Sequence, residues 1–455
     1  MFKRKKNAGK YGFQRLATPD TKWRGYQKSI KADDEKQQAI RRMPGYFAVL
    51  VIAAILIHGG FHLLEKKLPD PSDTVVSLYP PDVDPIDHQG LQNLLAADTF
   101  RNLTENKVEI STGTGTYQLY TSIDPDLQQS ILASLEKRHA HRIGIVAIEP
   151  DTGRVLSMVS YDREDPEHNT CLSADLPAAS IFKIVTASAA MGSGGFEKQS
   201  RFTYNGGRYT LYRSQLSARE NQYTNYVSLQ RAFAESNNPV FGKLGKNELG
   251  KDVLEKYAYA YYFNRPIEFD LPVETSVLEI NDTPYNWAEV ASGFNRTTTI
   301  SPLHAAMISA SMVNGGRIIK PTLIDVAARE DRTVYRCRPE VLSRTVDPSK
   351  VGDLNKLMGA TIRSGTARGQ FANISSSRVL SRLDMGGKTG SLNHPTRHIR
   401  YDWFTGYARD PEGSGKIAIG VIVAHKDYIG KRAATYFREA VFQYFQNRID
   451  TDRDI

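Results

Sequence analysis

The predicted strands lie at the two ends of a long region that is helical in between, and this order constrains the fold most. Residues 142–149 and 154–160 alternate as two strands, and Pro150–Gly153 between them has turn chemistry, so they form a hairpin. Three more strands are predicted at 383–391, 401–408 and 416–424. Because both groups must bury their apolar faces, we expect an α+β fold with one five-stranded antiparallel sheet flanked by helices.

Helix-like stretches fill the interval between the two groups of strands. A short strand at 117–123 and a helix that begins at Asp124-Pro125 come before the hairpin, so the main body starts near residue 117. Apolar periodicity, together with residues typical of helix starts and ends, predicts the other helices. One begins at Ser180, and the rest cover 229–233, 252–263, 301–312, 351–363 and 432–446.

The positive charge of the chain is concentrated at its N-terminus. The net charge is +9, and residues 1–42 hold 13 Lys and Arg against 4 Asp and Glu, which leaves 46 of each sign in the remainder. A neutral body argues against nucleic-acid binding, so we expect no nucleic acid among the partners.

An apolar segment follows the basic tail. Residues 45–64 contain no Asp, Glu, Lys or Arg, and twenty residues of helix span the ~30 Å hydrocarbon core of a bilayer. Arg41 and Arg42 precede the segment, which puts the N-terminus in the cytoplasm. We therefore expect a basic cytoplasmic tail at 1–42, a single transmembrane helix at 43–64, and everything after residue 65 outside the membrane.

Two other interpretations of the apolar segment remain open. It could be a buried core helix or the apolar part of a cleaved signal peptide. The long polar tail before it disfavours both, and no Ala-x-Ala cleavage site follows the apolar core. Residues 65–116 are rich in Pro and Asp, and we interpret them as an extracytoplasmic linker with a short collar.

Cysteine and histidine give no sign of a metal or disulfide framework. Cys171 and Cys337 are too few for either, and whether the two pair is left open. The histidine pairs at 139/141 and 394/398 lack an accompanying carboxylate motif. We expect no metal and no cofactor.

A serine and a lysine three residues apart begin an unusually apolar helix. Ser180 and Lys183 would lie on one face with Cβ atoms roughly 5–6 Å apart. Burying a single lysine at the start of an apolar helix costs free energy, so its presence there suggests a functional role. We interpret Ser180 as a nucleophile and Lys183 as the group that activates it.

Three short motifs occur in order along the chain. Ser180-x-x-Lys183 comes first, Ser236-Asn237-Asn238 second and Lys388-Thr389-Gly390 third. The first motif also has a decoy, because Ser134-Leu-Glu-Lys137 fits it, but Ser134 lies among charged residues on a solvated face. The surrounding sequence therefore favours Ser180 over Ser134 as the serine of the first motif.

Together these motifs resemble the penicillin-binding protein and serine β-lactamase superfamily, over residues 117–455. The segments at 122–128, 147–156, 300–316, 387–391 and 402–406 are similar to the transpeptidase domain of cell-wall synthases. The resemblance implies an α/β/α sandwich with an all-helical subdomain. Ala179 and Ile181 depart from the family pattern, which usually has glycine and threonine there.

The resemblance also implies a function and roles for the motif residues. We expect a monofunctional, membrane-anchored DD-transpeptidase that cross-links peptidoglycan stem peptides ending in D-Ala-D-Ala and so serves cell shape, on the outer side of the bacterial inner membrane. Thr389 and Ser391 would hold the terminal carboxylate, Gly390 would leave room for the substrate backbone, and the N–H groups of Ser180 and Ser391 would form the oxyanion hole. β-Lactams would be covalent inhibitors, and a membrane glycosyltransferase is an expected partner.

The chemistry of the lysines links the first and third motifs. As a base Lys183 must be neutral, whereas an ordinary lysine is neutral only about once in 2,500 at pH 7. Burial and a second cation both lower a lysine pKa, and Lys388 is the expected second cation. Ser236 would relay a proton to the leaving amine, and Asn238 would position Lys183 and the substrate amide. Alternation along a strand separates Lys388 and Gly390 from Thr389 and Ser391, so we expect a twist or bulge at the glycines.

Three alternatives to the transpeptidase remain. In a DD-carboxypeptidase water would replace the acceptor amine, and a β-lactamase would hydrolyse the drug rapidly. A protein of another class, a non-catalytic β-lactam-binding scaffold or sensor, would use the same site for binding alone. The intact motifs disfavour an idle scaffold.

Overall fold

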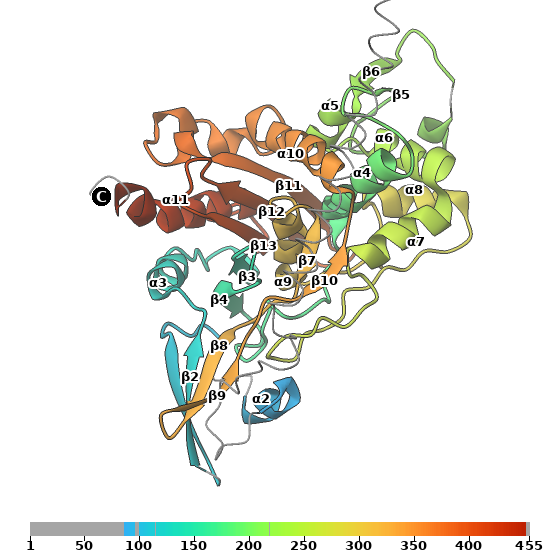
Figure 1. Cartoon of the computed structure of the whole chain (residues 1–455). Coiled ribbons are helices and arrows are strands. Elements are labelled where there is room, and N and C mark those ends of the chain that lie inside the picture. The colour runs from blue at the N-terminus through green and yellow to red at the C-terminus, as the bar shows by residue number, and fades with distance from the viewer. Residues whose placement is uncertain (1–85, 96–99, 114, 218, 452–455) are drawn as a thin grey trace, which may run out of the picture. The chain divides into compact units, whose positions relative to one another are not determined.

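A computed structural model describes residues 86–95, 100–113, 115–217 and 219–451 (Figure 1). The predicted basic tail and the predicted anchor at 43–64 lie outside these ranges, so both stay predictions. Within the described residues, no helix combines the length and the apolar character that crossing a bilayer requires.

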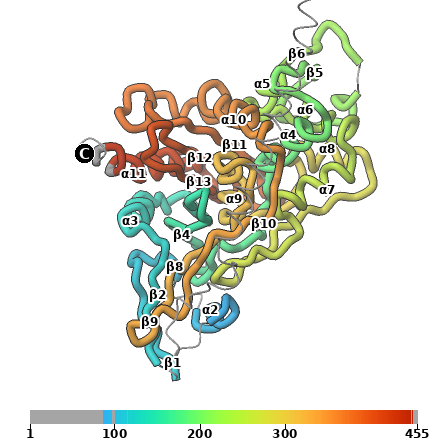
Figure 2. Tube along the Cα trace, viewed as in Figure 1, coloured from blue at the N-terminus to red at the C-terminus, as the bar shows by residue number. Residues whose placement is uncertain are grey.

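The central element is a five-stranded antiparallel sheet, as predicted from the sequence, and its strand order is β11-β12-β13-β3-β4. Its strands span β3 Ala140–Ile148, β4 Val155–Asp162, β11 Asp384–Asn393, β12 Ile399–Arg409 and β13 Lys416–Lys426. The C-terminal strand β13 pairs with β3, which joins the two ends of the main body in one sheet (Figure 2). The predicted turn at Pro150–Gly153 links β3 to β4.

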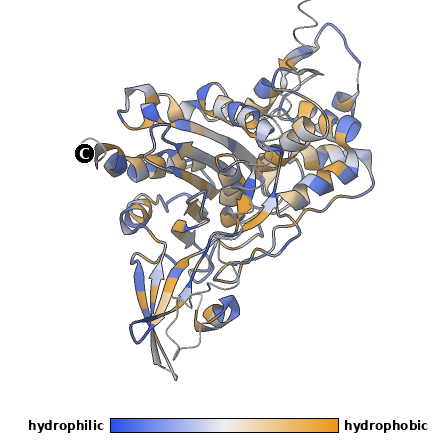
Figure 3. Ribbon diagram, in the orientation of Figure 1, coloured by the Kyte–Doolittle hydropathy of each residue, from blue (hydrophilic) through white to orange (hydrophobic). Residues whose placement is uncertain are grey.

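Helices cover both faces of this sheet, because the strands alternate between two apolar cores. Phe404 and Val421 point into the core under α3 (Pro125–Ala133) and α11 (Ala433–Thr451). Trp403 and Ile422 point into the opposite core, which α9 (Pro302–Ser311) fills. In Figure 3 this central region, where α9 packs on the sheet, is largely orange. The α/β/α layering expected from the resemblance is confirmed.

A lobe of helices lies beside the β11 edge of the sheet (Figure 1). It was expected to be all-helical, but the hairpin of β5 (Arg201–Tyr204) and β6 (Asn225–Ser228) also belongs to it. The half-exposed, weakly alternating sequence of these strands gave no clear periodicity. The helices of the lobe are α4 Lys183–Gly192, η3 Arg213–Leu216, α5 Leu229–Ala234, α6 Asn238–Lys243, η4 Leu244–Leu249, α7 Gly250–Ala260 and α8 Pro284–Ser292.

A second sheet of order β1-β2-β8-β9 adjoins the other end of the body. Here β1 (Lys107–Thr112) pairs with β2 (Gly115–Thr121), so the expected collar runs into the body without a break at residue 117. Leu91 and Phe100 are buried in the main core. The remaining elements are α2 His88–Leu94, β7 Arg317–Ile319, β8 Ile324–Arg329, β9 Arg332–Arg336, β10 Val341–Arg344, α10 Pro348–Arg363, η5 Arg368–Phe371, η6 Ile374–Ser376 and η7 Leu380–Arg382.

Candidate active site

Ser180 lies in a single 3₁₀ turn, η2 (Ala179–Phe182), directly before α4. We expected the α-helix itself to begin at Ser180; it begins at Lys183. Side chains three residues apart eclipse one another in a 3₁₀ helix, so the turn aligns Ser180 with Lys183. Ala179 adopts φ +49°, a left-handed conformation that L side chains rarely take.

The amine of Lys183 is completely buried and has three hydrogen-bond partners. Its Nζ lies 2.9 Å from Ser180 Oγ, 2.7 Å from Asn238 Oδ1 and 2.5 Å from the Ser292 carbonyl oxygen. The amide and backbone oxygens can only accept, so they take two N–H groups. A neutral amine then has its lone pair left for the third partner, the Ser180 hydroxyl. The arrangement suits transfer of the Ser180 proton to Lys183.

The electrostatic environment favours that neutral form. Burial, and secondarily the charge of Lys388, hold the pKa of Lys183 well below its ordinary value. Burial also lowers the pKa of Lys388 to about 7. In the described part of the chain, no hydrogen-bond partner of either amine is a carboxylate. The second cation expected from the sequence therefore acts on Lys183, although 205 positions separate the two lysines.

The second motif forms the turn between α5 and α6. Ser236 has φ +56°, and this conformation lets its buried hydroxyl accept a 3.0 Å hydrogen bond from Lys388 Nζ. Asn238 begins α6 and donates through Nδ2 to the Tyr209 carbonyl at 2.9 Å. This contact fixes the amide so that Oδ1 faces Lys183. Asn237 caps α6 by accepting from the Val240 N–H.

The third motif lies on β11, the edge strand of the sheet. Lys388 is buried and Ser391 is exposed, whereas Thr389 is half-buried with its hydroxyl 2.5 Å from that of Thr366. The β11–β12 register is continuous from Asp384 to Asn393, so of the predicted alternatives, a twist or a bulge, the bulge is absent. A bulge is not needed to bring Lys388, Thr389 and Ser391 to one cleft. Because β11 is the edge strand, side chains from both of its faces border the free edge of the sheet. A Cβ on Gly390 would lie 3.3 Å from Ile181, so this glycine lets η2 pack closely.

Comparison with known protein families decides the family. Residues 143–442 match the model of the penicillin binding protein transpeptidase domain. The chain belongs to this family. The three sequence motifs at 180–183, 236–238 and 388–390 all lie inside the matched region. That region also contains the whole central sheet except the first three residues of β3.

Sequence relatives agree with the family. Peptidoglycan D,D-transpeptidase PbpA of Mycolicibacterium smegmatis is 26% identical over 347 residues, which are 67% of this chain and 66% of that protein. Penicillin-binding protein 1A of Neisseria gonorrhoeae is 27% identical over 285 residues, 58% of this chain and 31% of the relative. The chain thus spans just under two thirds of the mycobacterial relative's length.

Solved structures share the fold. The ceftriaxone acyl-enzyme complex of penicillin-binding protein A from M. tuberculosis has a TM-score of 0.59 and 23% identity, covering 72% of this chain and 80% of that one. The D,D-transpeptidase domain of a peptidoglycan glycosyltransferase from Eggerthella lenta has a TM-score of 0.60 and 20% identity, covering 74% and 84%.

The structure brings the predicted residues together in two hydrogen-bonded groups: Ser180, Lys183 and Asn238 form one, and Ser236 and Lys388 the other. Sequence reasoning missed Ser292 and Gly293. Gly293 has φ +63°, and a Cβ there would lie 1.9 Å from the Ala179 oxygen. A glycine that follows a predicted apolar helix signals a helix end, but nothing in the sequence tells that this end abuts the nucleophile.

Trp403 and Phe404 are buried core residues, and Trp403 Nε1 donates to the Pro177 carbonyl in the loop before Ser180. Cys171 and Cys337 are both free thiols. Among the described residues, no group of His, Cys, Asp and Glu has the arrangement of a metal site.

Proposed function

We propose that this penicillin-binding protein is a serine DD-transpeptidase that cross-links peptidoglycan stem peptides ending in D-Ala-D-Ala. The observation that carries the proposal is the 2.9 Å contact between Lys183 Nζ and Ser180 Oγ, with both other partners of Nζ being acceptors. The names of the mycobacterial relatives support it.

The reaction divides into two acyl transfers. Lys183 takes the Ser180 proton as Oγ bonds to the carbonyl carbon of the penultimate D-Ala. The C–N bond to the terminal D-Ala then breaks, and the leaving amine takes a proton relayed through Ser236. An acceptor amine then attacks the ester carbonyl carbon and the C–Oγ bond breaks. One proton of the amine passes to Ser180 Oγ, which restores the serine, and the new amide bond is the cross-link.

Substrate positioning follows from β11 and its neighbours. Thr389 and Ser391 would bind the terminal carboxylate, while the N–H groups of Ser180 and Ser391 would stabilise the oxyanion. Gly390 keeps a side chain from the edge along which an extended peptide would lie.

Labelling by a fluorescent penicillin tests this proposal. We expect one stable adduct on Ser180, none on Ser180→Ala, and release of D-Ala from a D-Ala-D-Ala peptide with transfer to an added amine. No adduct on the folded wild type would contradict the acyl-enzyme. Rapid turnover of the drug would indicate a β-lactamase, and release without transfer a carboxypeptidase.

We also propose a single-pass anchor at 43–64 with the catalytic body on the extracytoplasmic side of the bacterial inner membrane, and a membrane glycosyltransferase as partner. The apolar, uncharged segment behind a basic tail supports the anchor. Protease added to spheroplasts should degrade the body of the full chain but spare the tail. Cross-linking in membranes should recover the glycosyltransferase.

A further inference from the structure

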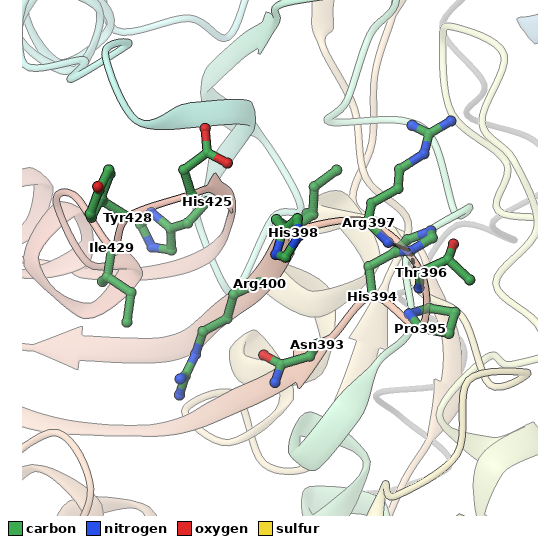
Figure 4. A pocket seen from close by; sticks show the side chains of 12 residues that line it. Asn393, His394, Pro395, Thr396, Arg397, His398, Arg400, His425, Tyr428 and Ile429 are labelled. Atoms are coloured by element: carbon green, nitrogen blue, oxygen red, sulfur yellow. Dashed lines mark hydrogen bonds between the residues drawn. The ribbon is translucent and has the colours of Figure 1, made fainter.

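A pocket of about 480 Å³ lies where β11 turns into β12, next to the end of β13 (Figure 4). It begins at Asn393, two residues after Ser391. Its lining contains two arginines and three histidines but a single carboxylate, Asp427. The pocket is therefore biased towards an anionic ligand.

Arg400 is the cation best placed to bind such a ligand. It pairs with Asn393 across β11 and β12, and Ser391 pairs with Asp402 two residues further along the strands. Side chains of paired residues, and of residues two apart, share a sheet face. The side chains of Arg400, Asn393, Ser391 and Thr389 thus lie on the same face. Figure 4 agrees, since Arg400 and Asn393 extend to one side of the strands and Arg397 to the other.

Two charged neighbours of Arg400 already have partners: Asp402 on the same face and Arg397 on the other. Asp402 accepts two hydrogen bonds from Arg432 and another from the Ala433 N–H. Arg397 faces Glu164 at 3.8 Å. The exposed side chain of Arg400, in contrast, has no hydrogen bond or ion pair among residues 86–95, 100–113, 115–217 and 219–451. Its planar guanidinium is free to bind a carboxylate through two N–H groups.

The direction of the bound peptide follows from the proposed function, on which this inference rests. With the terminal carboxylate at Thr389 and Ser391 and the reacting carbonyl at Ser180, the rest of the donor peptide must continue past Ser391 towards Asn393. Two strand residues cover roughly 7 Å. The residue before D-Ala-D-Ala would then reach the pocket.

We infer that Arg400 and the pocket at the β11–β12 turn bind a second carboxylate of the donor peptide, carried on the residue that precedes D-Ala-D-Ala. The site distinguishes a free carboxylate from its amide. A carboxylate gains two charge-assisted hydrogen bonds from the guanidinium, whereas an amide presents one oxygen and a competing donor.

Two synthetic peptides test this, identical except that the residue before D-Ala-D-Ala carries a free side-chain carboxylate or its primary amide. We expect the purified protein to release D-Ala from the free acid with a kcat/KM about tenfold higher. Arg400→Ala should abolish the preference, and Arg400→Lys should retain part of it. Acylation by benzylpenicillin, which lacks this group, should be unchanged in both variants.

Lys426→Ala is the matched control. Lys426 is an exposed cation at the same end of the sheet, but it pairs with Ile399, so it points to the opposite face from Arg400. It should keep the wild-type preference. Equal rates for both peptides in the wild type, or an equal loss for both in Arg400→Ala, would overturn the inference alone. No D-Ala release from either peptide by a protein that penicillin acylates would overturn the transpeptidase proposal as well.

Discussion

Lys388 donates a hydrogen bond of 3.0 Å to Ser236, and its charge lowers the pKa of Lys183. Lys388 on β11 therefore acts on both other motifs. It contacts the second motif through its hydrogen bond to Ser236, and it affects the first motif through the electrostatic effect of its charge on Lys183. No charged partner compensates either buried amine among the hydrogen bonds of the described residues. The site keeps its base neutral by burial and like-charge repulsion.

Replacing Lys388 by Met should move the pH profile of acylation. The pKa of Lys183 rises when the neighbouring cation is removed, so a higher pH is needed to deprotonate it. The rise of the second-order rate constant for penicillin acylation with increasing pH should therefore shift to higher pH. Lys426→Met, a distant exposed site, serves as the control. A profile that falls in amplitude without shifting would contradict the electrostatic link.

Lys183→Met should reduce acylation by about 10²- to 10⁴-fold, the usual effect of losing a general base. The apolar side chain fits the buried site, so the fold should persist. Stopped-flow measurement of penicillin acylation checks the rate, and thermal unfolding checks the fold. Retention of more than a tenth of the rate in a folded variant would assign the base elsewhere.

Ala179→Gly should stabilise the protein. The left-handed backbone at φ +49° costs an alanine about 1–2 kcal/mol, whereas glycine adds about 0.4–1 kcal/mol of unfolded-state entropy. We expect a net gain of about 0.5–1 kcal/mol in the free energy of unfolding, measured by urea denaturation. The neighbouring Ala178 has φ −63°, so Ala178→Gly should destabilise instead. Equal destabilisation by both changes would contradict the backbone strain inferred at Ala179.

Gly293→Ala should abolish penicillin labelling. The new Cβ would lie 1.9 Å from the Ala179 oxygen, so the turn that carries Ser180 must move or the lobe must unfold. Gly352→Ala in α10 is the control, because its Cβ meets nothing within 4 Å. Full labelling of Gly293→Ala by fluorescent penicillin would contradict the close approach of α8 to the nucleophile.

The sequence predicted the sheet and the three motifs because both leave local signals. Periodic strands around Pro150–Gly153 and the apolar helix after Ser180 are examples. Contacts that depend on how distant segments pack leave none. The carbonyl of Ser292 accepts from Lys183 only because α8 ends against η2, and the Thr366 hydroxyl meets Thr389 only because α10 packs against β11. Of the predicted twist or bulge, the bulge is absent, and strand periodicity could not show this because it does not reveal that β11 lies at an edge.

The position of β11 at the end of the sheet has a cost for selectivity. In the described residues its backbone pairs with β12 alone, so the opposite row of N–H and C=O groups is available to any extended chain, including a loop of another protein. Hydrogen bonds between backbones do not distinguish one amino-acid sequence from another. Under the proposed function the donor peptide lies along this edge as an extra strand, so side chains at the two ends of that strand must reject foreign peptides. Selectivity then depends on a few polar groups rather than on the length of the contact.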